Sequence, residues 1–361
     1  MTKVSVIKKI KDLLDEAINR KASDLHFEVY ENHFRVRFRI DGILQEFSKL
    51  PIIQKDEFIA RLKILSELNT AEKRRPQDGK FKHKFSGRDI DIRLSILPTF
   101  YGEKAVLRIL DRHNVQLSID ELGMSSLESK IFQQHINNPY GMILVTGPTG
   151  SGKTTTLYSA LNLINSDEVN ITTIEDPVEY NLHGINQSQV KPDIDYKFST
   201  ALRSILRQDP DVIMIGEIRD RETAEIAIHS ALTGHLVLST LHTNDATSAI
   251  TRLVNMGIEK YMIASSLKLV IAQRLVRKIC DKCKIFYTPD QELLKQLGLN
   301  PQNEYYHGKG CEACNNTGYR GRIGVFEILQ ITPEICNMIL DEKSETFIKE
   351  QIETQDMNKN L

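Results

Sequence analysis

The chain has 361 residues, of which 40% are hydrophobic and 26% charged, and its formal net charge is −1. This length predicts two to three domains, and the composition excludes a disulfide-stapled miniprotein and a disordered chain. Residues 1–112 carry 24 Lys and Arg against 17 Asp and Glu, whereas the rest carries 23 against 31. We expect a basic module that docks on an acidic one. No nucleic-acid partner is expected, because such binders more often carry clustered basic residues.

No apolar run approaches the roughly 18 residues of a membrane span. Residues 1–20 alternate charged side chains with Ile and Leu at helical spacing, unlike the apolar core of a signal peptide. The sequence therefore predicts a protein that stays in the cytosol.

The first part of the chain has the pattern of an α+β domain. Residues 34–40 alternate apolar side chains with Arg and end at an Asp-Gly turn, which indicates an antiparallel strand with one solvated face. Further strands are expected at residues 90–97 and 104–110, and helices at 4–20 and 55–69. We assign this domain to residues 1–112 and a linker to 113–126.

From residue 127 the pattern changes to apolar strands alternating with helices, which predicts a parallel sheet covered on both faces. The strands are expected at residues 142–146, 171–174, 212–215 and 236–241, and the helices at 153–164, 200–208 and 221–231. We assign this α/β domain to residues 127–340. It includes a Gly-rich cysteine segment over 276–325 and is followed by a polar tail over 341–361.

A phosphate-binding motif joins the first of these strands to a helix. Residues 147–154 match G-x-x-x-x-G-K-[ST], in which the glycines let backbone N–H groups face a phosphate at a helix N-terminus. Lys153 would bridge the β- and γ-phosphates, and the Thr154 hydroxyl would ligate Mg²⁺. ATP is expected, because no guanine-reading Asn-Lys-x-Asp segment occurs in a suitable place. The predicted nucleotide-binding residues are Gly147, Pro148, Thr149, Gly150, Ser151, Gly152, Lys153, Thr154 and Thr155.

Acidic residues and a histidine follow three more strands, at the sheet edge where ligands bind. Glu217 is a candidate to orient or deprotonate the attacking water, although Gly216 stands where such a strand usually ends in Asp; a helix N-cap is the alternative. Glu175 and Glu179 belong to a second acidic cluster that would share a cation or a water network. His242 is a candidate γ-phosphate sensor, and a structural hydrogen bond is the alternative.

Four of the five cysteines form two C-x-x-C pairs separated by 27 residues. Four thiolates complete a closed tetrahedral Zn²⁺ site with no open position, so the predicted role of Cys280, Cys283, Cys311 and Cys314 is structural. A redox pair is the alternative, since the gap exceeds the commoner spacing. Cys336 lies outside the set and is expected to be buried.

Several segments in the same order together resemble the secretion ATPase superfamily, and closely its type II secretion and type IV pilus assembly branch. The resemblance covers roughly residues 20–340. The segments that carry it are Ala22-Ser23-Asp24-Leu25-His26, Arg37-Phe38-Arg39-Ile40-Asp41-Gly42, Pro76-Gln77-Asp78-Gly79, the phosphate-binding loop, Glu175-Asp176-Pro177-Val178-Glu179, Gly216-Glu217-Ile218-Arg219-Asp220, and Thr233-Gly234-His235 through His242.

The resemblance implies a PAS-like α+β N-terminal domain followed by a RecA-like ATPase, assembled as a homohexameric ring. It implies that Arg93, Arg108, Arg203 and Arg207 reach nucleotide phosphates from the N-terminal domain or a neighbouring subunit, as arginine fingers do. Arg203 and Arg207 are expected to share one helix face. Taken alone, each arginine is more readily a surface or salt-bridging residue. The four-cysteine segment resembles assembly motors, whereas retraction motors lack it.

The resulting hypothesis is an ATPase motor, at the inner face of the cytoplasmic membrane, that acts on an inner-membrane platform protein to assemble pilin-like filaments for secretion, pilus growth or DNA uptake. A retraction motor, a nucleic-acid translocase and a non-hydrolysing nucleotide-binding regulator are the alternatives. Two departures from the family are expected: the extra N-terminal domain that binds a membrane partner is missing, and the C-terminus is shorter and polar.

Overall fold

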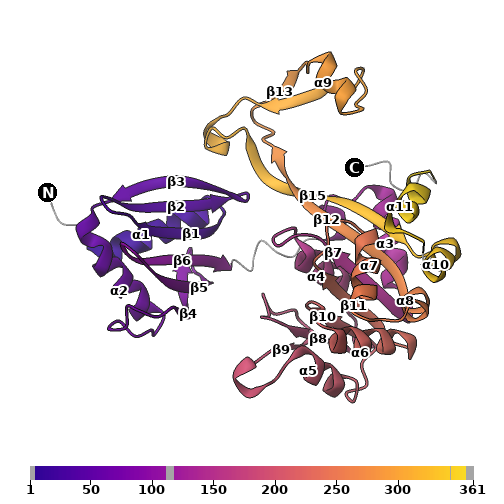
Figure 1. The fold of residues 1–361 in the computed structure, drawn as a ribbon. Coiled ribbons are helices and arrows are strands. Elements are labelled where there is room, and N and C mark those ends of the chain that lie inside the picture. The colour runs from indigo at the N-terminus through magenta and orange to yellow at the C-terminus, as the bar shows by residue number, and fades with distance from the viewer. Residues whose placement is uncertain (1–4, 111–117, 342, 355–361) are drawn as a thin grey trace. The chain divides into compact units, whose positions relative to one another are not determined.

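The computed structural model describes residues 5–110, 118–341 and 343–354 and separates into two compact units, residues 1–115 and 116–361 (Figure 1). Residues 113–117 of the expected linker and residues 342 and 355–361 of the expected tail lie outside the described residues. Within the described parts of the chain, no helix has both the length and the apolar character needed to cross a bilayer.

Over residues 5–110, the N-terminal unit is a six-stranded antiparallel sheet with two α-helices, in the strand order β3-β2-β1-β6-β5-β4. Its elements are α1 (Val6–Asn19), β1 (Ala22–Val29), β2 (Phe34–Ile40), β3 (Ile43–Leu50), α2 (Lys55–Leu65), β4 (Gln77–Phe85), β5 (Arg88–Thr99) and β6 (Gly102–Leu110). Alternate residues of β2 are buried, as its sequence pattern predicts. Phe27, Phe34 and Phe58 pack together in the core. Helix α2 ends before the expected Asn69, because Glu67 has a φ of 58° and Leu68 N–H donates back to the Lys63 carbonyl.

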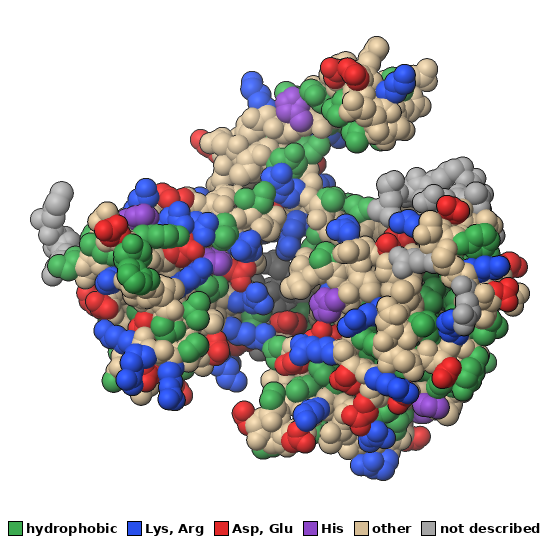
Figure 2. Space-filling model, viewed as in Figure 1, with side chains coloured by type: hydrophobic (Ala, Val, Ile, Leu, Met, Phe, Trp, Pro, Cys, Tyr) green, Lys and Arg blue, Asp and Glu red, His purple; other side chains and the backbone are tan. Residues whose placement is uncertain are grey.

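The face of this sheet opposite the core of Phe27 and Phe34 carries charged side chains. Lys and Arg are frequent on the surface of this unit that is seen in Figure 2. Glu28 on β1 lies close to Arg35 (3.1 Å), Arg37 (2.8 Å) and Lys104 (3.2 Å). Burial alone would raise the pKa of Glu28, but the hydrogen bonds and charges of Arg37 and Lys104 outweigh it and lower the pKa to about 2. Glu28 is therefore a carboxylate that three cations, from the two strands on either side of β1, hold in place.

The C-terminal unit is built on a seven-stranded sheet in the order β15-β12-β7-β11-β10-β8-β9, in which only β15 is antiparallel to its neighbour. Its elements are α3 (Ser126–Ile136), β7 (Gly141–Thr146), α4 (Lys153–Ile164), β8 (Ile171–Glu175), β9 (Asn186–Gln189), α5 (Phe198–Ile205), β10 (Val212–Ile215), α6 (Arg221–Leu232), β11 (Leu236–Leu241), α7 (Thr247–Asn255), α8 (Lys260–Ser266), β12 (Leu267–Ile279), β13 (Lys284–Tyr287), α9 (Gln291–Gln296), β14 (Tyr305–Gly308), β15 (Tyr319–Gln330), α10 (Pro333–Leu340) and α11 (Glu345–Thr354).

Both faces of this sheet are buried. Met142 and Leu144 of β7 lie in a core with helices α5 to α8, whereas Ile143 and Val145 of the same strand lie in a second core with α3 and α4. Because alternate residues face two different buried cores, the strands of this sheet are continuous apolar runs in the sequence.

Two segments that the sequence assigns to connections contribute to these cores. Ile119, Leu122 and Met124, within the expected linker, are buried against the α4 side. Ile348 of α11, within the expected tail, is buried in the other core, so the described part of that tail packs as a helix on the unit.

Strands β12 and β15 continue beyond the sheet as a two-stranded ribbon that ends in a projecting arm (Figure 1). We call residues 280–318 the cysteine arm, since they hold both C-x-x-C pairs, the β13–β14 hairpin and α9.

Candidate active site and metal centre

The phosphate-binding loop connects the carboxyl end of β7 to the first turn of α4. Gly147, Gly150 and Gly152 have φ values of 143°, 80° and 90°, which side chains other than glycine rarely tolerate. A Cβ on Gly147 would also lie 2.3 Å from the carbonyl oxygen of Gln273. The loop can therefore curl in this way only with glycine at these positions.

Lys153 points back into the loop. Its Nζ donates to the carbonyl oxygens of Gly147 (2.9 Å) and Pro148 (3.1 Å). Burial lowers the pKa of Lys153, and the charge of Glu217 acts in the opposite direction. A phosphate group in the loop would supply the anionic partner that this buried ammonium group requires.

Glu217 follows β10, and His242 follows β11, the neighbouring parallel strand. His242 Nε2 lies 3.0 Å from Glu217 Oε2, and Arg219 makes a close ion pair with the same carboxylate. Arg219 also approaches Asp176 at 3.5 Å. Burial favours a higher pKa for Glu217, but the hydrogen bonds and charges of Arg219 and His242 prevail and lower it. Glu217 is therefore a carboxylate at neutral pH.

The position before this carboxylate is tight for a side chain. A Cβ on Gly216 would lie 3.3 Å from Glu175 Cα and 3.4 Å from the Ile174 carbonyl oxygen, because β8 runs alongside β10. The acid that such strands usually carry at their end is consequently found one residue later, at Glu217.

Glu175 faces a different environment from Glu217. It is 2% exposed and accepts hydrogen bonds from Thr173 (2.6 Å), Gln187 (3.1 Å) and the hydroxyl of Tyr158 on α4. Burial raises the pKa of Glu175. Glu179 is half-buried, and its backbone N–H donates to the same Tyr158 hydroxyl. The structure thus brings the two glutamates together around Tyr158.

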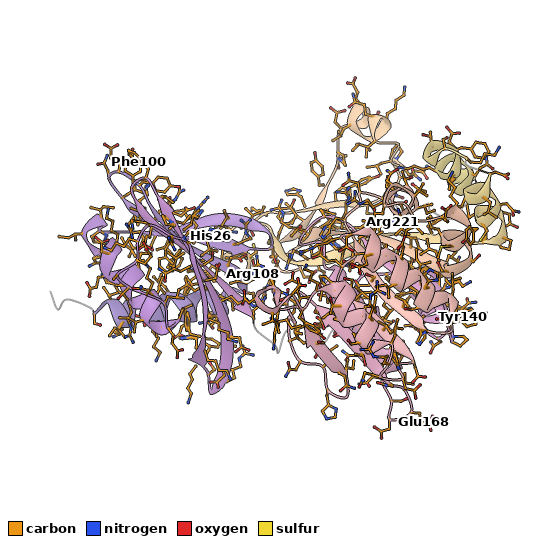
Figure 3. All side chains as sticks on the ribbon, turned by 60° about the horizontal axis from the view of Figure 1, so that its bottom comes forward. His26, Phe100, Arg108, Tyr140, Glu168 and Arg221 are labelled. Carbon is orange, nitrogen blue, oxygen red and sulfur yellow. The ribbon has the colours of Figure 1, made fainter. Side chains whose placement is uncertain are left out.

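The four candidate arginines lie in pairs on the two units. Arg93 and Arg108 are opposite each other on β5 and β6, and Arg108, labelled in Figure 3, lies 3.1 Å from Asp24. Arg203 lies 3.0 Å from Glu222. The expected helix over residues 200–208 ends at Ile205, so Arg207 follows the helix and donates to the Arg203 carbonyl oxygen at 2.8 Å.

Three residues of this site were not among the predicted ones. Arg219 belongs to the segment Gly216–Asp220 that carries the family resemblance, so its position in the sequence could have indicated a role in the site. Tyr158 and Gln273 could not be found from sequence. The contact of Tyr158 with Glu175, and that of Gln273 with the phosphate-binding loop, join elements that are distant in sequence.

The four predicted cysteine ligands converge at the base of the cysteine arm, with all four Sγ atoms within 4.8 Å of one another. The Sγ separations are 3.9 Å for Cys280 and Cys311, and 3.8 Å both for Cys283 and Cys314 and for Cys311 and Cys314. Four sulfurs arranged tetrahedrally about 2.3 Å from Zn²⁺ are about 3.8 Å apart, so this donor set fits the metal. Cys336 is half-buried and donates to the Ala264 carbonyl oxygen.

A glycine-rich loop between a parallel strand and a helix, with a histidine after the adjacent strand and a carboxylate after the strand beyond it, defines a P-loop nucleoside triphosphatase. A sequence profile of the family described as "Type II/IV secretion system protein" matches residues 2–361. The chain therefore belongs to the type II/IV secretion system protein family, that is, to the secretion and pilus ATPases.

Relatives with assigned names support this membership. Type II secretion system protein E of Dickeya dadantii (strain 3937) is 50% identical over 95% of this chain and 69% of its own length. The type IV pilus assembly ATPase PilB of Myxococcus xanthus (strain DK1622) is 48% identical over 96% of this chain and 62% of its own length. The chain thus spans roughly two thirds of the length of these relatives.

Solved structures support the fold. The pilus retraction motor PilT with bound ADP aligns with a TM-score of 0.65 and 28% identity, over 97% of this chain and 91% of that chain. The Legionella pneumophila ATPase DotB aligns with a TM-score of 0.70 and 20% identity, over 99% and 90% of the two chains.

Proposed function

We propose that this chain is the ATP-hydrolysing motor of a type II secretion or type IV pilus machine, and that it drives filament assembly. The observation that carries the proposal is the combination of the phosphate-binding loop with the Glu217–His242–Arg219 cluster at the edge of one parallel sheet. The higher identity to a secretion protein and an assembly ATPase than to a retraction motor favours assembly.

Within this proposal, each site residue has a definite task. Lys153 and the loop N–H groups hold the phosphates, with Pro148, Thr149, Ser151 and Thr155 flanking them. When Mg²⁺ is bound, Thr154 supplies its hydroxyl as a ligand, and the metal neutralises phosphate charge. Glu217 accepts a proton from the attacking water, and His242 and Arg219 hold that carboxylate ionised and oriented. Glu175 and Glu179 support α4 through Tyr158.

We propose further that the N-terminal unit is PAS-like, that the C-terminal unit is RecA-like, and that six copies form a ring. Arg93, Arg108, Arg203 and Arg207 would then complete the nucleotide site from another unit or subunit. Zn²⁺ held by the four cysteines would have a structural role. The ring would work in the cytoplasm at the inner membrane face, against a platform protein.

The test is ATP turnover with three single variants of the full chain. Lys153→Ala should lose nucleotide binding, and Glu217→Gln should bind ATP but turn over at least about 10²-fold more slowly, as expected when a water-activating group is removed. Glu168→Gln, at the exposed glutamate labelled in Figure 3, is the matched control and should turn over at the wild-type rate. Normal turnover by Glu217→Gln would refute its assigned role.

A nucleic-acid translocase is the alternative from a different class. Its ATP turnover should rise with DNA or RNA, and its binding should weaken steeply with salt. We expect no stimulation by single-stranded or duplex DNA, and stimulation by a fragment of the platform protein or by anionic liposomes in the same buffer. Stimulation by DNA alone would overturn the assembly motor.

A further inference from the structure

Strand β12 lies directly against the phosphate-binding loop. It pairs with β7 as far as Ala272 opposite Thr146, so Gln273 lies beside Gly147, where β7 ends and the loop begins. The separation of 2.3 Å between the Gln273 carbonyl oxygen and a Cβ on Gly147 means that the two backbones are in contact. The first glycine of the loop is therefore fitted to the backbone of β12.

The Gln273 side chain reaches the other end of the same loop. It is 3% exposed, and its Oε1 accepts a hydrogen bond of 2.7 Å from the hydroxyl of Thr156 on α4. Its Nε2 faces Gly152 and would lie 2.9 Å from a Cβ built on that glycine. The Leu275 side chain would lie 3.5 Å from the same Cβ. Thr156 is fully buried as well. One residue of β12 thus contacts the start of the loop, its last glycine and the helix that carries Lys153.

The same strand leads to the cysteine arm, with a register shift in its pairing to β15 between Arg277 and Ile279. Beyond Gln273, β12 stays paired with β15 from Phe326 to Arg322 and ends at Ile279, immediately before Cys280. The paired ribbon resists bending more than a single strand would, so it is suited to carry a displacement between the cysteines and Gln273. Within the described C-terminal unit, β12 is a covalent and hydrogen-bonded path between the two sites.

We propose that Gln273 is a positioning residue that holds the phosphate-binding loop in the shape required for nucleotide binding, and that the cysteine arm acts on nucleotide affinity through it. The proposal rests on the nucleotide-binding role assigned above to the loop. Gln273 would act through Thr156 and Gly152, without contact to the reacting atoms.

The first experiment separates positioning from folding. The dissociation constant of a fluorescent ADP analogue, and KM and kcat for ATP, are measured for Gln273→Leu, Thr156→Val and the double variant. Each single variant should weaken binding roughly fivefold to tenfold, the loss expected for one buried hydrogen bond. KM should rise with little change in kcat, since the contact is made equally before and during reaction. The double variant should be no worse than either single variant, because both remove the same interaction.

A second glutamine on the same ribbon provides the matched control. Gln330 of β15 contacts His135 at 3.3 Å, at the end of the ribbon opposite to the cysteine arm, so Gln330→Leu should leave affinity unchanged. If Gln273→Leu fails to fold, Thr156→Val alone tests the interaction. Wild-type affinity and KM in a folded Gln273→Leu or Thr156→Val chain would overturn the proposal. Failure of the unaltered chain to bind the ADP analogue would instead refute the proposed function.

The second experiment tests transmission from the arm. Cys283→Ser with Cys311→Ser should weaken binding of the ADP analogue at least about fivefold in the otherwise unaltered chain, the lower end of usual coupling between sites. In the Gln273→Leu background the same cysteine changes should have no further effect. An equal additional loss in both backgrounds, or no loss in either, would refute transmission through Gln273.

Discussion

The assignment of Glu175 as a structural residue leads to a prediction about Tyr158. Replacing Tyr158 by Phe removes a hydroxyl that donates to the buried Glu175 and accepts from Gln187 Nε2 at 3.3 Å. Thr173 and Gln187 remain as donors to Glu175. A hydrogen bond to a charged group such as a carboxylate contributes about 1.5–3 kcal/mol, which for a unit of this size corresponds to a fall in Tm of about 3–12 °C.

The measurement is differential scanning calorimetry of the full chain, with turnover assayed well below the melting temperature. Tyr158→Phe should lower the Tm of the C-terminal unit and leave kcat within a few-fold of wild type. Tyr140→Phe is the control, because Tyr140 is exposed on the surface (Figure 3). Glu175→Gln should lose less than about tenfold in turnover, whereas Glu217→Gln loses 10²-fold or more. The reasoning is refuted if a folded Glu175→Gln chain is inactive while Glu217→Gln turns over normally.

Three further predictions concern the metal, the N-terminal sheet and the arginines. Purified protein should contain about one Zn²⁺ per chain by metal analysis, and chelation should lower its Tm, because local folding is coupled to metal binding; an unchanged Tm without metal would remove the structural role. Because the folded pKa of Glu28 is depressed to about 2, its charge stabilises the N-terminal unit above the ordinary pKa of 4.5, and this is lost as pH falls through about 2. Glu28→Gln should thus lower unfolding free energy by on the order of 3 kcal/mol at neutral pH, a difference that should vanish near pH 2 in denaturant titrations; a constant difference would contradict it. Mixing Lys153→Ala with Arg207→Ala subunits should restore part of the turnover if Arg207 acts between subunits, and no recovery at any ratio, with assembly verified by light scattering, would argue against that role.

The elements that the sequence predicts well are those whose own residues carry the signal. Helix α4 begins and ends where expected, and β10 and β11 have the expected bounds, because their apolar runs are bounded by glycine, acidic or histidine residues. Strand β4 was not expected, since it is an edge strand whose residues are all at least partly exposed, with several lysines. Strand β12 was not predicted at all, although its inner half is an apolar, buried run; its outer half is largely exposed.

The candidate site likewise contains features that the sequence predicts and features that it does not. The phosphate-binding loop and the cysteine pairs are local motifs whose spacing alone indicates their chemistry. The ion pair between Arg219 and Glu217 and the hydrogen bond between Gln273 and Thr156 depend on which strands become neighbours in the sheet. Strand order follows from tertiary packing, so no short stretch of sequence contains it.

The two glutamates that end adjacent strands illustrate how such packing assigns chemical roles. Ile174 and Ile215 are register partners on β8 and β10, so Glu175 comes directly beside Gly216 and occupies the space that a side chain there would need. Burial raises the pKa of Glu175, whereas Arg219 and His242 overcome burial and lower that of Glu217. Glu175 is occupied by hydrogen bonds from Thr173, Gln187 and Tyr158, whereas Glu217 stands beside His242 and Arg219, so Glu217 is the carboxylate placed to act on a water. A side chain at Gly216 would press on the backbone of β8 at Glu175 and Ile174, so an acid introduced at Gly216 should not replace Glu217.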